Sequence, residues 1–473
     1  MIVPRNRLLF WVAVVVLPFA LLGAVEPAAT VFSLGAIGIF FALALADAAG
    51  AGRNLAGLSL GLPAVARMSK HRAAKLEVQI RNERQKPRTV RLALALPREI
   101  HSPQEDAYVA LPRDSEWSRF AWNCLPLKRG RYRLEHARIE TGSPLGFWDA
   151  RKTVAAPAEI RVYPNLFRER RDLAALFLHR GTFGLHAQRQ VGKGREFEKL
   201  RDYIPGDSYD EIHWKATARR ARPITKVFQI ERTQEVYVVI DASRLSARPA
   251  GESCRLKVAG SRLPFGLPSG PEAPEPQPAT CNFQPSTTLE RFITAALVLG
   301  MAAEQQGDLF GLLTFTDRVE SFVRARNGKA HYSACRDALY TLEPQVVTPD
   351  YDEVCTFIRL RLRRRALLVF LTALDDPVLA ESFVRHLDLI RRQHLVLVNM
   401  LQPPGVAPVF ADPDVASVDD LYQRLGGHLL WHNLRELEKV LQRRGVRFSL
   451  LKNERLSAEL VSQYLGVKRR QAL

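Results

Sequence analysis

The segment from Gly192 to Asp241 reads GKGREFEKLRDYIPGDSYDEIHWKATARRARPITKVFQIERTQEVYVVID. It closes on residues 236–240, five apolar residues that are followed directly by Asp241. An uninterrupted apolar run of this length is typical of a parallel strand that is buried on both faces. Upstream of it, we expect residues 196–201 to form a short amphipathic turn and residues 203–207 a tight turn with Pro and Gly at its corner.

Beyond Asp241 the pattern alternates between strands and helices. Thr287 to Glu290 has the form of a capping box, apolar residues follow at helical spacing, and Gly307 is placed to end that helix. Such alternation implies a largely parallel sheet with helices on both faces. Further strands are expected at 309–315, 319–323, 367–372, 394–400 and 446–451. The Pro-rich residues 244–285 cannot bury a core, and their composition indicates an exposed insertion.

Two uncharged apolar runs, residues 8–25 and 28–46, open the chain. Each is about long enough to cross roughly 30 Å of hydrocarbon as a helix. A cleaved signal peptide is the alternative, because Arg5 and Arg7 precede an apolar core. The second run follows so closely that a two-helix membrane anchor over residues 1–50 is the better interpretation.

Basic residues flank both outer ends of this expected hairpin, and neither span holds an ionisable residue before Asp47. The positive-inside rule therefore places both termini and the soluble domains in the cytoplasm. The absence of charge within the spans indicates an anchor rather than an ion pathway. The residues after the second span that support this orientation are Arg53, Arg67, Lys70 and Arg72.

Composition supports a globular body at a membrane surface. The chain has 473 residues, and its 68 Lys and Arg exceed its 49 Asp and Glu, so the formal net charge is +19. Anionic lipid explains this excess, although nucleic acid or an acidic protein partner would also fit it. The five cysteines contain no C-x-x-C pair, which favours reduced thiols.

Short alternating strands fill residues 58–165 and predict an all-β sandwich, Ig-like in outline. Residues 75–80 and 89–96, for example, alternate at period two. A linker over residues 166–235 follows, and within it a helix is expected at 166–191. Three apolar residues share one side of that expected helix: Leu173, Leu176 and Phe177.

The pattern G-x-E-F-x-x-L-R-x-Y-x-P-G-D, then I-[DNH]-W-K-x-[TS]-A-R and a strand ending in D-x-S, resembles the DUF58 family. The resemblance implies a bacterial inner-membrane protein whose residues 236–473 form a von Willebrand A-like, Rossmann-type α/β domain. The signature positions, structural or partner-binding, are Gly194, Glu196, Phe197, Leu200, Arg201, Tyr203, Pro205, Gly206, Asp207, His213, Trp214, Lys215 and Arg219.

The resemblance further implies a scaffold that binds a MoxR-type AAA+ ATPase, together with other von Willebrand A proteins. One rival is a hydrolase or nuclease using Glu196, Asp207 and Asp241, but the chain lacks P-loop, H-E-x-x-H and G-x-S-x-G motifs, so we expect no enzyme. His213 beside Trp214 is typical of a hydrogen-bonded structural residue. A second rival is a nucleic-acid-binding membrane protein, for which the basic cluster is Lys215, Arg219, Arg220, Arg222 and Lys226.

Resemblance to von Willebrand A domains also implies a metal site built on a D-x-S-x-S loop. Asp241 and Ser243 match its first two positions, but Leu245 takes the third and Ala373 stands where another ligand Asp is expected. Asp375 lies slightly further on. Mg²⁺ requires oxygen ligands near octahedral geometry, so we expect a degenerate site that holds Mg²⁺ weakly at most.

The charge distribution around the two spans gives a test of topology. A reporter fused after Leu473 should be active only if it functions in the cytoplasm, because basic residues hold both outer ends of the hairpin there. Paired cytoplasmic and periplasmic reporters at this position measure the outcome. A periplasmic signal would contradict both the orientation and the class of partner.

Overall fold

The computed structural model describes residues 1–85, 87–113, 115–167, 169–171, 173–174, 191–204, 209–229, 234–250, 286–409 and 418–470. The chain divides into two compact units, Met1–Asn165 and Leu166–Leu473. Most of the expected Pro-rich insertion, residues 251–285, lies outside the described residues. So do the signature residues Pro205, Gly206 and Asp207, and Leu176 and Phe177 of the expected linker helix.

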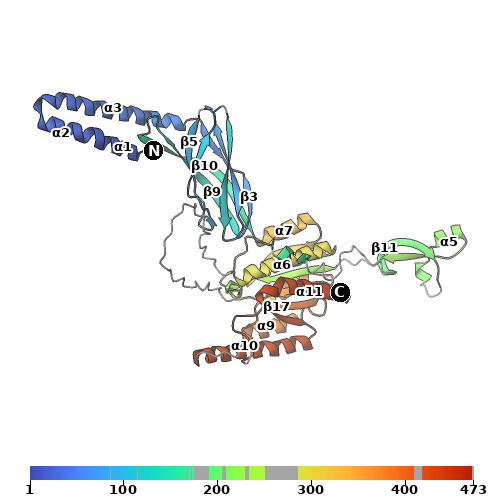
Figure 1. Ribbon diagram of the computed structural model, residues 1–473. Coiled ribbons are helices and arrows are strands. Elements are labelled where there is room, and N and C mark those ends of the chain that lie inside the picture. Colours follow the sequence, from blue (N-terminus) through green and yellow to red (C-terminus); the bar gives the residue numbers. More distant parts are fainter. Residues whose placement is uncertain are drawn as a thin grey trace, which may run out of the picture. The chain divides into compact units, whose positions relative to one another are not determined.

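A helical hairpin opens the first unit (Figure 1). Its first arm contains α1 (Asn6–Trp11), the π-helical turn η1 (Val12–Val16) and α2 (Leu17–Val25); its second contains η2 (Pro27–Ala29) and α3 (Thr30–Leu55). Asn6–Val25 and Pro27–Leu55 are both long and apolar enough to cross a membrane. Large apolar side chains along them are exposed, including Phe10 at 62% and Val31 at 82%. Such an exposed apolar surface is suited to the hydrocarbon interior of a membrane.

Two β-sheets follow the hairpin and share one hydrophobic core. The six-stranded sheet has the order β1-β10-β9-β5-β7, with β3 also paired to β10, and the four-stranded sheet has the order β2-β4-β8-β6. Inward side chains alternate along the strands, as Leu76, Val78 and Ile80 do on β4. The strands are β1 (Ile2–Pro4), β2 (Leu58–Gly61), β3 (Val65–Ser69), β4 (Ala74–Asn82), β5 (Arg88–Leu94), β6 (Ile100–His101), β7 (Ala107–Leu111), β8 (Trp117–Pro126), β9 (Gly130–Gly142) and β10 (Trp148–Tyr163).

Strand β1 was not expected from the sequence, and it ties the N-terminus to the sandwich. Ile2 to Pro4 pair antiparallel with Trp148 to Ala150 at the start of β10. Arg5 follows, and its Nε lies 2.9 Å from the carboxylate of Asp149. The residues before the first span therefore meet the same end of the sandwich that α3 reaches after the second span.

Asp47, near the end of the second span, joins α3 to the loop before β10. Its side chain is 4% exposed. One carboxylate oxygen accepts hydrogen bonds from the Ser143 hydroxyl at 2.5 Å and the Phe147 backbone N–H at 3.2 Å, and the other accepts from the Leu145 N–H at 2.9 Å. The indole of Trp148 donates to the Ala44 carbonyl at 2.8 Å. The loop thus supplies the donors that a buried carboxylate requires.

The second unit is built on a six-stranded sheet in the order β15-β14-β13-β16-β17-β18. Five strands are parallel, and β15 pairs antiparallel at one edge. This is the largely parallel sheet that the alternating pattern predicted. The strands are β13 (Glu235–Asp241), β14 (Leu309–Phe315), β15 (Val319–Arg326), β16 (Leu367–Leu371), β17 (Leu395–Leu401) and β18 (Arg447–Leu451).

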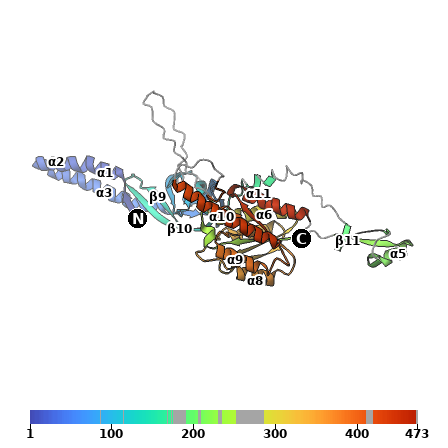
Figure 2. The same cartoon turned by 90° about the horizontal axis from the view of Figure 1, so that it is seen from below.

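Helices cover both faces of this sheet, and successive β13 residues alternate between the two cores. Val238 belongs to the core under α6, α7 and α11, and Val239 to the core under α8, α9 and α10. Figure 2 shows α8 and α9 side by side, where Tyr351 and Phe383 pack with ring centroids 5.0 Å apart. The helices are α6 (Thr288–Gln305), α7 (Lys329–Leu339), α8 (Tyr351–Arg361), α9 (Pro377–Leu387), α10 (Val418–Arg443) and α11 (Leu456–Arg469), with short turns η4 (Arg244–Ala247) and η5 (Asn453–Arg455).

Thr287 is the N-cap of α6, as the predicted capping box requires. The Thr287 hydroxyl oxygen accepts a hydrogen bond from the Glu290 backbone N–H at 3.4 Å, and α6 begins at the next residue, Thr288. At the other end, Gly307 adopts a positive φ of 73°, just past the last helical residue. Local sequence therefore sets both ends of this helix.

The expectation of an amphipathic turn at residues 196–201 is wrong. These residues belong to β11 (Val191–Asp202), which pairs antiparallel with β12 (Ile224–Gln229). The helix expected up to residue 191 is likewise wrong at its end, because Val191 already starts β11. A partner strand more than twenty residues away supplies backbone hydrogen bonds that local spacing does not reveal. The connection contains η3 (Tyr209–Glu211) and α5 (Trp214–Arg220).

The Asp47 junction can be tested by removing its acceptor. Asp47→Ala leaves two backbone N–H groups and the Ser143 hydroxyl without their partner. We expect a loss of about 2–3 kcal/mol in the free energy of unfolding, measured as a fall in Tm for the full chain in detergent. Asp47→Asn should lose less, because it keeps one oxygen. Glu26→Ala, which changes an exposed acidic residue in the hairpin turn, is the control. Equal losses for Asp47→Ala and Glu26→Ala would contradict the assigned role.

Candidate functional site

Asp241 stands at the carboxyl end of β13, and its side chain is fully buried. One carboxylate oxygen accepts a hydrogen bond from the backbone N–H of Ser243 at 2.8 Å. The other accepts one from the hydroxyl of Thr372, which directly follows β16, at 2.6 Å. Because β13 and β16 are parallel neighbours, their carboxyl ends meet at one edge of the sheet. The strand order therefore brings Asp241 and Thr372 together.

Further uncharged groups extend this network. The Tyr351 hydroxyl at the start of α8 lies 3.0 Å from the Thr372 hydroxyl oxygen. Ser243 is also fully buried, and its hydroxyl oxygen accepts from the Leu245 backbone N–H at 3.4 Å. The Ser246 hydroxyl donates to the Ser243 carbonyl at 2.8 Å. These bonds hold the loop after β13 in one conformation.

Burial dominates the electrostatics of the network. It raises the pKa of Asp241, and the hydrogen bonds from Ser243 and Thr372 oppose that rise. Burial also raises the pKa of Tyr351 well above its usual value, and the nearby Asp241 carboxyl group adds to this rise. The donors to Asp241 are all uncharged. The Asp241 carboxyl group is therefore placed to accept hydrogen bonds that hold the loop, rather than to act on a molecule from solvent.

The residues at this edge do not fit an octahedral metal shell. Leu245 lies in the apolar core, and Ala373 offers only a methyl group. Asp375 pairs with the guanidinium of Arg248 instead of joining Asp241. A pocket of about 50 Å³ beside them has room for a few water molecules. Within the described ranges, no group of three His, Cys, Asp or Glu residues could hold a metal ion.

The signature residues form a separate module around β11 and β12. The His213 Nδ1 accepts a hydrogen bond from the Ala216 backbone N–H at 3.1 Å and so caps the N-terminus of α5. The Thr217 hydroxyl oxygen accepts from the Ile224 N–H at 3.0 Å, which joins α5 to β12. The Tyr203 and Tyr209 rings stack with centroids 6.3 Å apart. His213 thus has a structural hydrogen bond.

The remaining signature positions lie on the strand and on the helix surface. Gly194, Glu196 and Phe197 belong to β11, and their side chains are outside the described part of the chain. Leu200 is 37% exposed. Trp214, on α5, is 68% exposed.

The basic cluster of the second rival hypothesis lies on this same module. Lys215, Arg219 and Arg220 are exposed on α5. Arg222 pairs with Asp202 across 3.3 Å, and Lys226 lies on β12. The cluster therefore combines positive charge with the exposed indole of Trp214.

Sequence reasoning missed Thr372 and Tyr351 as members of the buried network. A hydroxyl residue at the last position of a predicted neighbouring strand was the available signal for Thr372, because carboxyl ends of parallel strands meet. Tyr351 comes from a helix, and no sequence pattern pointed to it.

Comparisons with known proteins place the second unit in a family. The model described as "Protein of unknown function DUF58" matches residues 199–257 and 280–407. The uncharacterized protein YeaD of Bacillus subtilis (strain 168) is 24% identical over 150 residues, which are 31% of this chain and 37% of that protein. The uncharacterized protein Rv1480 of Mycobacterium tuberculosis is 24% identical over 230 residues, 48% of this chain and 60% of that protein.

Solved structures with partial similarity include the conserved hypothetical protein BatB from Bacteroides thetaiotaomicron. It is 12% identical with a TM-score of 0.28, over 50% of this chain and 99% of that one. An aerotolerance-related membrane protein from Bacteroides fragilis is 10% identical with a TM-score of 0.27, over 49% of this chain and 97% of that one.

The raised pKa of Asp241 predicts a pH-dependent stability. Between about pH 4, where an unfolded Asp loses its proton, and the raised pKa, the folded state holds one proton more than the unfolded state. Stability therefore falls as the pH rises through this window. Asp241→Asn removes this titration and can still bond Ser243 and Thr372. The Tm of Asp241→Asn minus the Tm of the wild type should increase as the pH rises from about 4 and should then level off.

Thermal unfolding of the full chain across a pH series gives the measurement. Asp210→Asn is the control, because Asp210 is an exposed acid in η3. A Tm difference between Asp241→Asn and the wild type that stays constant with pH, or falls, would contradict the assigned burial effect.

Proposed function

Because the chain belongs to the DUF58 family, we propose that it is a membrane-anchored scaffold whose α/β unit binds another protein. The exposed apolar hairpin supplies the anchor. We place the soluble units on the cytoplasmic face of a bacterial inner membrane, on the charge distribution around the spans. The matched relatives are themselves uncharacterised, so the docking face is argued from the physical features of this chain and the partner from the family resemblance.

We assign the α/β unit a von Willebrand A-like fold. Three features support this assignment: the strand order, the antiparallel edge strand β15, and the Asp-x-Ser sequence after the central strand β13. In this chain the edge that would hold a metal carries a buried network instead. Partner binding is therefore assigned to another surface of the unit.

The observation that carries the proposal is an exposed apolar stripe on the first half of α10. Tyr422 is 69% exposed, Leu425 47% and Leu429 58%, although all three are large apolar side chains. Together with Val418 and Leu421 they follow the i, i+3, i+4, i+7, i+11 spacing of one helix face. A contiguous apolar face of this kind marks a site of protein interaction.

This stripe is distinct from the face by which α10 packs on its own unit. Leu430, Leu434 and Leu441 contact the core over the sheet. At 3.6 residues per turn, those positions lie roughly 150° around the helix from Leu425 and Leu429. The stripe on the first half of α10 and the packing face, which continues through the second half, therefore lie on different sides of the helix.

The proposed partner is a MoxR-type AAA+ ATPase, as the family resemblance implies. An apolar helix face fits a hydrophobic groove on such a partner. The hydrolase alternative finds little support, since Asp241 is buried and its oxygens already accept hydrogen bonds. Because the basic cluster on α5 is exposed, nucleic-acid binding is measured alongside partner binding.

The double variant Leu425→Gln/Leu429→Gln tests the stripe. Both residues are exposed, so we expect little loss of stability, whereas capture of the co-expressed MoxR-type ATPase by the full chain should fall at least about tenfold. Leu360→Gln is the matched control, because Leu360 on α8 is 71% exposed.

Three outcomes would overturn this assignment. Undiminished capture by the double variant would exclude the stripe as the docking face. A loss of self-association without a loss of ATPase binding would identify a second copy of the chain as the occupant. Binding of DNA or RNA that weakens steeply with salt would favour the nucleic-acid alternative.

A further inference from the structure

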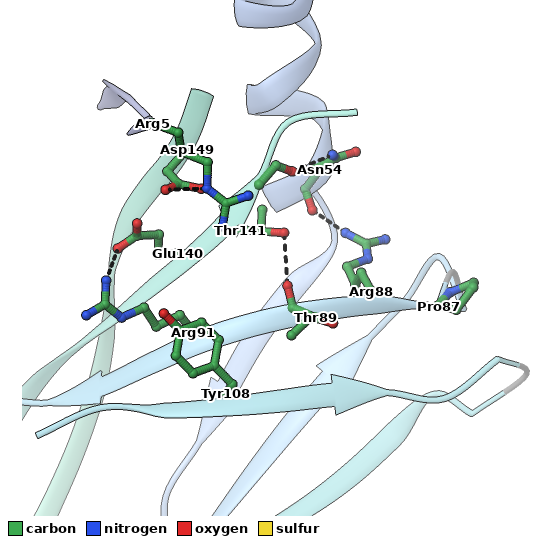
Figure 3. Close-up of a pocket in the computed structure, with 11 residues that line it drawn as sticks. Arg5, Asn54, Pro87, Arg88, Thr89, Arg91, Tyr108, Glu140, Thr141 and Asp149 are labelled. Atoms are coloured by element: carbon green, nitrogen blue, oxygen red, sulfur yellow. Dashed lines mark hydrogen bonds and ion pairs between the residues drawn. The ribbon is translucent and has the colours of Figure 1, made fainter. Parts of the chain in front are cut away.

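A second pocket lies in the first unit, where α3 meets the six-stranded sheet (Figure 3). Its volume is about 380 Å³, within the range of small-molecule sites. Arg5, Asn54, Arg88, Arg91 and Tyr108 line it, together with Glu140 and Asp149. The pocket is thus polar and rich in guanidinium groups.

Every carboxylate at this pocket already has a cation. Asp149 lies 2.9 Å from Arg5 Nε. Glu140 receives a hydrogen bond from Arg151 at 3.0 Å. Arg91, which also lines the pocket, pairs with Asp106, and its guanidinium lies over the Tyr108 ring. These pairs leave no acidic group free to neutralise a further cation.

Arg88 is the cation that remains. Its guanidinium donates a hydrogen bond to the Asn54 backbone carbonyl, and it forms no ion pair with any residue that the structure describes. Burial lowers the pKa of Arg88, and the like charge of Arg84 lowers it further. An arginine nevertheless stays protonated at physiological pH. Because no acidic group among the described residues neutralises this half-buried guanidinium, an anion that accepts its other N–H groups would bind there favourably.

The depth of the pocket points to the membrane surface. At 1.5 Å per residue, Asn54 lies about 36 Å along α3 from Thr30. The hydrocarbon layer is only about 30 Å thick, and Glu26 places the hairpin turn at its far side. Asn54 and the Arg88 guanidinium bonded to it therefore lie at the level of the lipid head groups on the near side.

We propose that this pocket binds the phosphate group of an anionic glycerophospholipid. Arg88 holds the phosphate oxygens with its free N–H groups. An anionic head group fits better than a zwitterionic one, because Glu140 and Asp149 are already paired and cannot receive an ammonium group. This site goes beyond the proposed scaffold function, since it concerns lipid rather than a protein partner.

The test uses the full chain in detergent, titrated with phosphatidylglycerol, phosphatidylcholine or inorganic phosphate, with bound ligand counted by native mass spectrometry. Arg88→Gln should weaken phosphatidylglycerol binding about tenfold, the loss expected for one charge-assisted contact. Arg88→Lys keeps the charge but loses the planar fork, and should weaken binding by less.

Arg119→Gln is the matched control, because it removes the same charge from an exposed position on β8 of the other sheet. The affinity of the Arg119→Gln variant for phosphatidylglycerol should stay within about twofold of the wild-type affinity, as expected for a distant surface charge. An equal loss for Arg119→Gln and Arg88→Gln would overturn the proposal in favour of general surface charge. Inorganic phosphate bound as tightly as phosphatidylglycerol would overturn the lipid assignment, and equal affinity for phosphatidylcholine would overturn the anionic preference.

Discussion

Strand β13 is buried on both faces, and the organisation of the α/β unit depends on this constraint. Because neither face meets water, its side chains are apolar on both sides and helices must cover both. Its carboxyl end carries Asp241, which is itself buried. A buried carboxyl group needs fixed donors, and Ser243 and Thr372 supply them from loops that the parallel strands bring to one edge. A position that could hold a metal ligand thus becomes a structural acceptor.

The first unit contains two charged side chains, Asp47 and Arg88, in different surroundings near the expected membrane surface. Asp47 is enclosed, and the loop before β10 satisfies its oxygens with three donors. Arg88 also lies in the first unit, and no carboxylate of the described residues forms an ion pair with it. The satisfied charge fixes the hairpin to the sandwich, since removing its partners would leave buried polar groups unpaired. The unsatisfied charge instead creates a site for an anion, and anionic lipid is the abundant anion at that depth.

The surfaces that suit binding lie outside the buried network. The stripe on α10 exposes Leu425 and Leu429 opposite the face that packs on the sheet. The module around α5 exposes Trp214 beside positive charges. Exposed apolar or charged groups can exchange their contacts with water for contacts with a partner. Asp241 and Tyr351, in contrast, are buried and already have hydrogen-bond partners within the protein. These exposed groups are the features on which the proposed scaffold function rests.

The sequence by itself determined the elements whose cause is local. Charge-free runs of sufficient length indicated the two spans, period-two alternation indicated strands such as β4, and Thr287 marked the start of α6. It misassigned residues 196–201, because their local spacing suits a turn while their backbone partner lies on β12. Only the tertiary structure joined Thr372 to Asp241, 131 residues apart, and enclosed Asp47 in a loop a hundred residues away. Such contacts depend on strand order and on the packing of distant segments, and no local pattern of side chains encodes these.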